Sequence, residues 1–144
     1  MLQTVLLLPL CANLALFALF GHTLLPGRVA LLTRLATLAR GCVLDPSSRR
    51  YSRRVTFLWT LWFAFMAGLM LLGVLTPSWR DAALVAAGVN GPLCTAFLVA
   101  EFFCRRLVLP GYDHMTLAGF FRFLVRLDYR AALKAPMPGG EGRP

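Results

Sequence analysis

Glu101 is the side chain that most strongly suggests chemistry, because it is the only acid inside a long apolar run. A carboxylate within a membrane span is a default candidate for moving protons or ions. Arg105 follows four residues later, where oppositely charged side chains share one helix face. Glu101 also lies near the end of its apolar run. We therefore favour a structural Glu101–Arg105 ion pair over a proton or ion site, and both alternatives stay open.

The tripeptide Asn90-Gly91-Pro92 is a second candidate, near the middle of the same run. Pro92 has no N–H, so it frees a backbone carbonyl one turn earlier, and the side chain of Asn90 could compensate. A packed kink or a substrate cavity would explain this pattern. We predict the packed kink.

Asp113 and His114 could support acid–base chemistry at a membrane surface. The acyltransferase spacing H-x-x-x-x-D does not start at His114, because Gly119 stands where the Asp would be. The chain also lacks the serine-hydrolase, phosphate-loop and dinucleotide motifs. We predict that the two residues cap a loop, and we assign no catalytic residue.

Metal, disulfide and cofactor chemistry are not expected. The chain has only two histidines, and no two cysteines have C-x-x-C spacing. We expect reduced thiols at Cys11, Cys42, Cys94 and Cys104.

Arginines supply another kind of candidate site. The pairs Arg49-Arg50 and Arg53-Arg54 flank Tyr51 immediately before an apolar run. Arginines at one level of a membrane interface can hold lipid phosphates or act only as topology signals. The candidate lipid- or partner-binding residues are Arg49, Arg50, Arg53, Arg54, Arg105, Arg106, Arg122, Arg126 and Arg130.

Three apolar runs must position these residues. The chain has 144 residues, of which 58% are hydrophobic and 15% charged, whereas soluble domains average about 45–50% and about 25%. The runs cover residues 2–20, 55–76 and 82–103, and each is long enough for a helix to cross a bilayer. We predict an all-α membrane protein, one domain over residues 1–134, and an uncleaved first span rather than a signal peptide.

The distribution of basic residues predicts the orientation. Seven lie in residues 21–54, one lies in the connection 77–81, and seven follow residue 103. The positive-inside rule then places the N-terminus outside and the C-terminus in the cytoplasm. The short connection makes the second and third spans antiparallel neighbours. Because the bases adjoin apolar runs, the net charge of +9 favours anionic lipid over nucleic acid as the partner.

Two shorter segments are amphipathic, and we expect both to be cytoplasmic helices at the membrane surface or packed on a partner. In residues 29–40, Leu31 and Leu35 share a face opposite Thr33 and Thr37. In residues 116–134, Arg122, Arg126 and Arg130 form a basic stripe. Asp45 and Pro46 suit the start of the helix that leads into the second span. Residues 135–144 are rich in Pro and Gly, and we predict a disordered tail.

Small residues repeat every four positions in the third span, and two occur at this spacing in the second. Such patterns allow helix backbones to approach closely. We predict contact between these spans, and a homo-oligomer stays possible. The residues are Ala83, Ala87, Gly91 and Thr95, with Ala64 and Gly68.

Three stretches resemble a family of small bacterial inner-membrane proteins to which no reaction is assigned. They are residues 21–28 (GHTLLPGR), 51–56 (YSRRVT, with Trp59) and 101–106 (EFFCRR). Members often accompany aryl-polyene or xanthomonadin-like biosynthesis genes, beside acyl carrier proteins, ketosynthases and acyltransferases. The resemblance implies a lipid or polyene pathway in the inner membrane. Val29-Ala30 replace a common Glu, which weakens a catalytic role for that loop.

The leading hypothesis is a non-catalytic membrane subunit that brings acyl carrier protein or soluble acyl-chain enzymes to the bilayer. Carrier proteins are acidic, which suits the basic face. The alternatives are a membrane enzyme or a carrier or transporter component that acts on a lipid-linked product.

Overall fold

The computed structural model describes residues 2–40 and 44–108. Within these ranges the chain forms four α-helices, one 3₁₀ turn and no strand: α1 (Leu2–His22), α2 (Leu31–Arg40), α3 (Pro46–Leu75), η1 (Pro77–Trp79) and α4 (Arg80–Val108). Three of them, α1, α3 and α4, are long and apolar enough to cross a membrane. The predicted all-α membrane fold is therefore confirmed.

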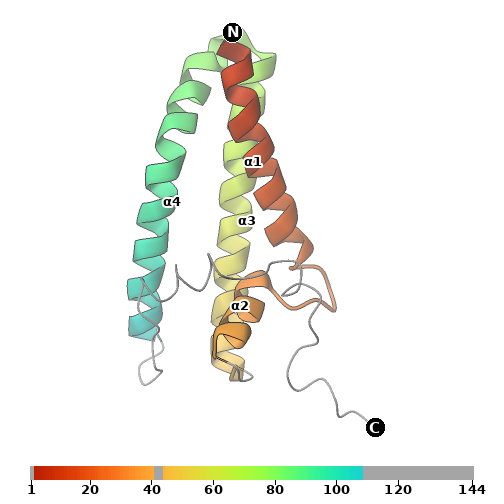
Figure 1. The fold of residues 1–144 in the computed structure, drawn as a ribbon, viewed down its shortest axis with the longest axis vertical. Helices are drawn as coiled ribbons and strands as arrows, with labels where there is room; N and C mark the ends of the chain where they lie inside the picture. Colours follow the sequence, from red (N-terminus) through yellow and green to blue (C-terminus); the bar gives the residue numbers. More distant parts are fainter. Residues whose placement is uncertain (1, 41–43, 109–144) are drawn as a thin grey trace.

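The central element is α3, and α1, α2 and α4 all pack against it (Figure 1). Its N-cap is Asp45, whose Oδ2 accepts hydrogen bonds from the backbone N–H of Ser47 and Ser48. This satisfies two donors that the first turn of a helix leaves free. At its other end, the N–H of Thr76 bonds the carbonyl of Leu72 at 2.7 Å. The connection η1 then reverses the chain, so α3 and α4 form the expected antiparallel hairpin.

Two apolar clusters hold the long helices together. Nearer the hairpin connection, Leu10 of α1 and Ala86 of α4 pack with Met66, Ala67 and Met70 of α3. Nearer the start of α3, the rings form a second cluster: Trp59 stacks on Phe63 with ring centroids 5.4 Å apart, while Phe20 and Phe97 approach these rings from α1 and α4. Because lipid tails are as apolar as these side chains, close packing rather than escape from water favours this contact.

The predicted contact between the second and third spans is present and includes Ala83, but the predicted residues Gly68 and Gly91 take no part in it. A Cβ added at Gly68 or Gly91 would meet nothing within 4 Å, whereas one at Gly73 would collide with the Cβ of Ala83. The physical reason is helix geometry. Steps of four drift by about 40° each along a helix of 3.6 residues per turn, whereas the line of buried α3 positions that leads to Gly73 alternates in steps of four and three. These are Trp59, Phe63, Met66, Met70 and Gly73.

The helix α2 lies within the predicted segment 29–40, but the assignment of its faces was incomplete. Leu31 and Leu35 are buried as expected, and so are Thr33 and Thr37, which were assigned to the polar face. The Thr37 hydroxyl donates to the Thr33 carbonyl at 2.9 Å. A threonine that bonds the preceding turn in this way hides its polar group and can be buried.

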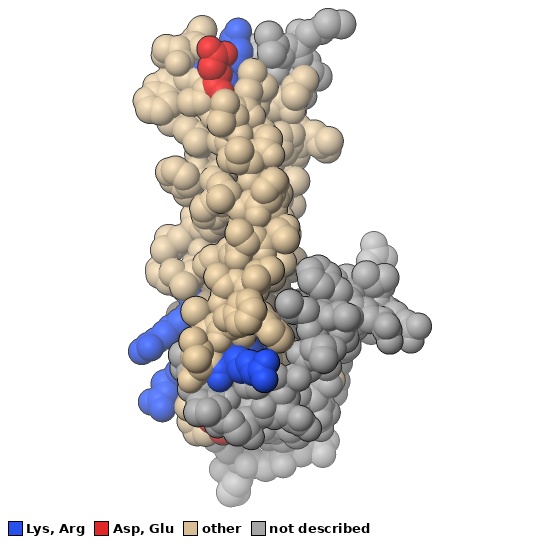
Figure 2. Space-filling model, turned by 90° about the vertical axis from the view of Figure 1, so that its left-hand side faces the viewer, with Lys and Arg blue, Asp and Glu red and all other residues tan. Residues whose placement is uncertain are grey.

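Charge separates the two ends of the helix bundle. We call the end with Arg49, Arg50, Arg53, Arg54, Arg105 and Arg106 the basic end, and the end with Arg80 and Asp81 the hairpin end. Figure 2 shows a broad uncharged surface between the charged groups of the two ends. An uncharged middle with charged ends is the arrangement that a bilayer requires.

Candidate functional site

The basic end is the part of the described chain with the greatest excess of one charge. Because α3 runs unbroken from Pro46, its arginines repeat at the helical spacing i, i+4, as Arg49 with Arg53 and Arg50 with Arg54. All four side chains are exposed. No hydrogen bond or ion pair joins Arg49, Arg50 or Arg54 to another side chain of the described ranges, so their guanidinium groups are available to an anion.

Glu101 and Arg105 form the predicted ion pair. Arg105 donates from Nε at 2.9 Å and from Nη2 at 2.6 Å to the same oxygen, Oε1. The carboxylate side chain is only 10% exposed, and Tyr51 reaches across from α3 to donate to the Glu101 backbone carbonyl at 3.4 Å. The ion pair therefore lies within α4, and the Tyr51 hydrogen bond connects this part of α4 to α3. Arg105 is engaged, while Arg106 is exposed.

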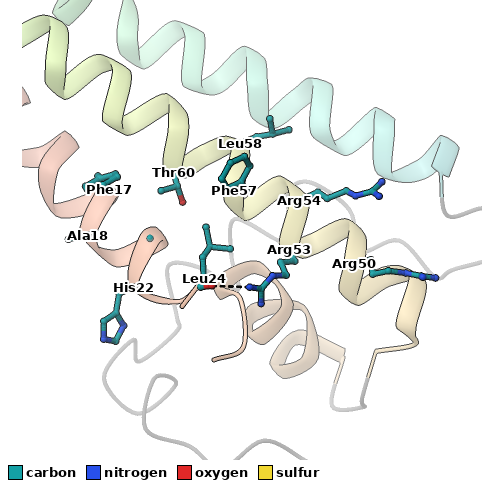
Figure 3. A pocket seen from close by; sticks show the side chains of 11 residues that line it. Phe17, Ala18, His22, Leu24, Arg50, Arg53, Arg54, Phe57, Leu58 and Thr60 are labelled. Atoms are coloured by element: carbon teal, nitrogen blue, oxygen red, sulfur yellow. Dashed lines mark hydrogen bonds between the residues drawn. The ribbon is translucent and has the colours of Figure 1, made fainter. Parts of the chain in front are cut away.

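A groove of about 970 Å³ opens where the end of α1 meets the start of α3 (Figure 3). Arginines of α3 line the part of the groove near the start of that helix. One to two helical turns further along α3, the wall becomes apolar at Phe57 and Leu58. From α1 it receives Phe17, Ala18 and Gly21, and a Cβ added at Gly21 would lie 3.4 Å from Thr60, which marks a close approach of the two helices. The lining residues are Phe17, Ala18, Gly21, His22, Leu24, Arg50, Arg53, Arg54, Phe57, Leu58 and Thr60.

Hydrogen bonds hold the loop that closes one side of this groove. Nη2 of Arg53 donates to the Leu24 carbonyl at 2.9 Å, and Figure 3 draws this contact. Thr23 donates to the Phe20 carbonyl at 2.7 Å and accepts from the N–H of Leu31 at 3.0 Å, which ties the end of α1 to the start of α2. Arg53 therefore positions the loop, and its remaining N–H groups can still reach a ligand.

A polar network of three residues joins the three long helices in their apolar middle, and the sequence analysis singled out only one of them, Asn90. Nε1 of Trp62 donates to Oδ1 of Asn90 at 3.1 Å, and Nδ2 of Asn90 donates to Oδ1 of Asn13 at 3.3 Å. Asn13 is 2% exposed, and its Nδ2 also bonds the Pro9 carbonyl at 2.8 Å. We call Asn13, Trp62 and Asn90 the asparagine network. A lone Asn within the Leu-rich first span was the available signal.

The structure changes the predicted role of Asn90. Its side chain was expected to compensate the carbonyl freed by Pro92, but its hydrogen bonds reach Trp62, Asn13 and the Cys94 thiol. The helix α4 continues through Pro92 as a single element. Asn90 thus connects helices instead of repairing a kink.

The candidate polar residues do not converge on one site. Asn90 and Glu101 are eleven residues apart on α4, which is about 16 Å along the helix axis. Asp113, His114, Arg122, Arg126 and Arg130, the predicted helix 116–134 and the predicted tail 135–144 all lie outside the described residues. Within the described residues no group of three His, Cys, Asp or Glu side chains could hold a metal, and Cys11, Cys94 and Cys104 are free thiols.

No family model, no curated protein and no solved structure matches the chain. The resemblance to the inner-membrane family associated with aryl-polyene clusters therefore stays a prediction.

Proposed function

We propose that the protein is a non-catalytic subunit of the bacterial inner membrane whose basic end faces the cytoplasm and recruits an acidic soluble partner. The partner we favour is an acyl carrier protein, or a ketosynthase or acyltransferase that works on carrier-bound acyl chains. The observation that carries the proposal is the set of exposed arginines on α3, none of which forms an ion pair within the described residues, together with the exposed Arg106 on α4.

Electrostatics supports this role in two ways. Exposed charges of one sign attract an oppositely charged protein over a Debye length of about 8–10 Å, and this speeds its association. Two acids are described near these arginines. Asp45 caps α3, and the charge of Glu101 is neutralised by Arg105. The hairpin end has Arg80 beside Asp81 and offers no comparable field.

The alternative of an enzyme or a carrier for a lipid-linked product is less well supported by the described residues. Glu101 would have to leave its two bonds with Arg105, and Asn90 would have to leave the asparagine network. The pathway itself, lipid or aryl-polyene biosynthesis, rests on the family resemblance.

Orientation is tested first, with a reporter that is active only outside the cytoplasm. We expect activity when it is fused near Ser78, and silence when it is fused after Arg54 or at Lys134. Activity at Lys134 would contradict the proposed topology.

Recruitment is tested with the full-length protein in lipid nanodiscs and a purified acidic acyl carrier protein. The double variant Arg49→Gln/Arg106→Gln removes two exposed charges outside the groove. Exposed pairs contribute about 0.2–1 kcal/mol each, so carrier affinity should fall roughly two- to 30-fold. Binding by the unchanged protein should also weaken as salt rises from 50 to 300 mM. Equal affinity for variant and parent, with no salt dependence, would exclude recruitment by the basic end.

A further inference from the structure

The groove between α1 and α3 has a polarity that changes along the helix axis. Arg50 and Arg54 lie one helical turn apart, and Leu58 follows one further turn along the same side of α3. The distance from Arg50 to Leu58 along the axis is about 12 Å. Over that distance the wall passes from exposed guanidinium groups to exposed apolar side chains, with Phe57 52% and Leu58 50% exposed.

This gradient matches a single kind of ligand. A phosphate with an acyl chain needs cationic donors at one end of its site and an apolar surface at the other, and arginine binds phosphate with several N–H donors. A free phosphate would gain nothing from the apolar part. A hydrocarbon without a head group would gain nothing from the arginines.

The position of the groove selects the source of such a ligand. It begins where the uncharged surface of the bundle gives way to the basic end, which is where phospholipid head groups lie when α1, α3 and α4 cross a bilayer. Its apolar part continues along α1 through Phe17 and Ala18, both of which are exposed toward the lipid region. An adjacent lipid can therefore enter sideways without leaving the membrane.

We propose that this groove is a binding site for one anionic phospholipid, with its phosphate held by Arg50 and Arg54 and one acyl chain lying on Phe17, Ala18, Phe57 and Leu58. Arg53 acts as a positioning residue, since its bond to the Leu24 carbonyl holds the loop at the head-group end. The site requires the membrane placement of the bundle but no acidic protein partner, so it goes beyond the proposed function.

The test measures how tightly the purified full-length protein retains phosphatidylglycerol and phosphatidylcholine, by native mass spectrometry over a lipid titration. The parent should bind phosphatidylglycerol more tightly than phosphatidylcholine. Each arginine near a lipid surface changes affinity by about fivefold, so Arg50→Gln/Arg54→Gln should weaken phosphatidylglycerol binding roughly 25-fold. The matched control Arg49→Gln/Arg106→Gln removes the same charge outside the groove and should retain the lipid as the parent does.

A second variant tests the apolar part without changing charge. Ala18→Phe adds a ring to an exposed position in the groove wall, and it should reduce lipid retention while carrier-protein binding is unchanged. The control Arg49→Gln/Arg106→Gln should show the opposite pair of results, so failure of the lipid site and failure of recruitment can be told apart.

Three results would overturn the proposed lipid site. They are equal retention of the two lipids by the parent, equal losses in the groove and control double variants, and displacement of the lipid by millimolar inorganic phosphate. The last result would mean that the arginines take a free anion. Size-exclusion profiles and helicity identify any variant that is misfolded. If the Arg50→Gln/Arg54→Gln protein is misfolded, Ala18→Phe becomes the deciding variant, and unchanged retention of phosphatidylglycerol by Ala18→Phe would then refute the site.

Discussion

Replacing Asn90 by Ala should destabilise the helix bundle through the asparagine network. The change removes two interhelical hydrogen bonds, from Trp62 Nε1 at 3.1 Å and to Asn13 Oδ1 at 3.3 Å. Polar contacts between membrane helices contribute on average about 0.6 kcal/mol and at most about 1.7 kcal/mol. The free energy of unfolding should therefore fall by about 1–3 kcal/mol, with the polar groups of Trp62 and Asn13 left without these partners.

The measurement is reversible unfolding in mixed micelles, with the fraction of SDS as the denaturant and helicity as the signal. Thr95→Ala is the matched control, because Thr95 is exposed on the same helix and its hydroxyl bonds only the Gly91 carbonyl, at 3.1 Å, among the described residues. It should change stability by less than about 0.5 kcal/mol.

A double-mutant cycle separates the Asn13–Asn90 contact from the general effect of substitution. Asn13→Ala and Asn90→Ala should be less destabilising together than the sum of the two single changes, because each single change already breaks the shared bond. The reasoning is refuted if Asn90→Ala and Thr95→Ala unfold at the same fraction of SDS. It is also refuted if the free-energy losses of the two asparagine substitutions add within about 0.3 kcal/mol.

Three further changes test other contacts by the same unfolding measurement. Gly73→Ala should lower the free energy of unfolding by about 1–3 kcal/mol because its new Cβ collides with that of Ala83, and the swap Gly73→Ala/Ala83→Gly should restore most of this loss. The control Gly68→Ala should be neutral or slightly stabilising, so equal effects at positions 68 and 73 would contradict the packing. Asp45→Ala should cost about 1 kcal/mol through the lost N-cap, whereas Asp45→Asn keeps an acceptor and should cost less; identical losses would show that the cap contributes little. Glu101→Gln should cost on the order of 1 kcal/mol, since the pair lies near the membrane interface and its Arg105 side chain is 28% exposed and partly solvated. A normally abundant Glu101→Gln protein with complete loss of pathway product would reassign the carboxylate to chemistry.

Features that depend on neighbouring residues along the chain could be predicted from the sequence. The three long helices follow from runs of apolar residues longer than a bilayer is thick, and the N-cap at Asp45 and the Glu101–Arg105 pair follow from spacings of two to four residues. For the cap and the ion pair, both partners lie within about one helical turn of the chain. The local sequence is therefore enough to predict these interactions.

Features that depend on how the helices face one another could not be predicted in the same way. The close contact of Gly73 with Ala83 and the bond of Asn13 to Asn90 depend on the rotation of each helix about its axis. Several sets of small residues in these spans would have suited a close contact equally well. The bulky side chains of α3 from Trp59 to Met70 determine how the helices face one another and therefore which small residues meet. The groove has the same origin, because it combines arginines of α3 with apolar residues of α1.

The bond between Asn13 and Asn90 has a consequence for how the protein enters the membrane during synthesis. The two residues are 77 positions apart, and at about 5–20 residues per second a ribosome needs roughly 4 to 15 s to make the intervening chain. During that interval α1 has a polar side chain and no third helix to receive it. Nδ2 of Asn13 donates to the Pro9 carbonyl within α1 and also to the Met70 sulfur of α3 at 3.7 Å, so the first helix satisfies one donor by itself and α3 supplies a partner for the other. The acceptor oxygen of Asn13 needs α4, so its hydrogen bond with Asn90 can form only when all three spans are in the membrane.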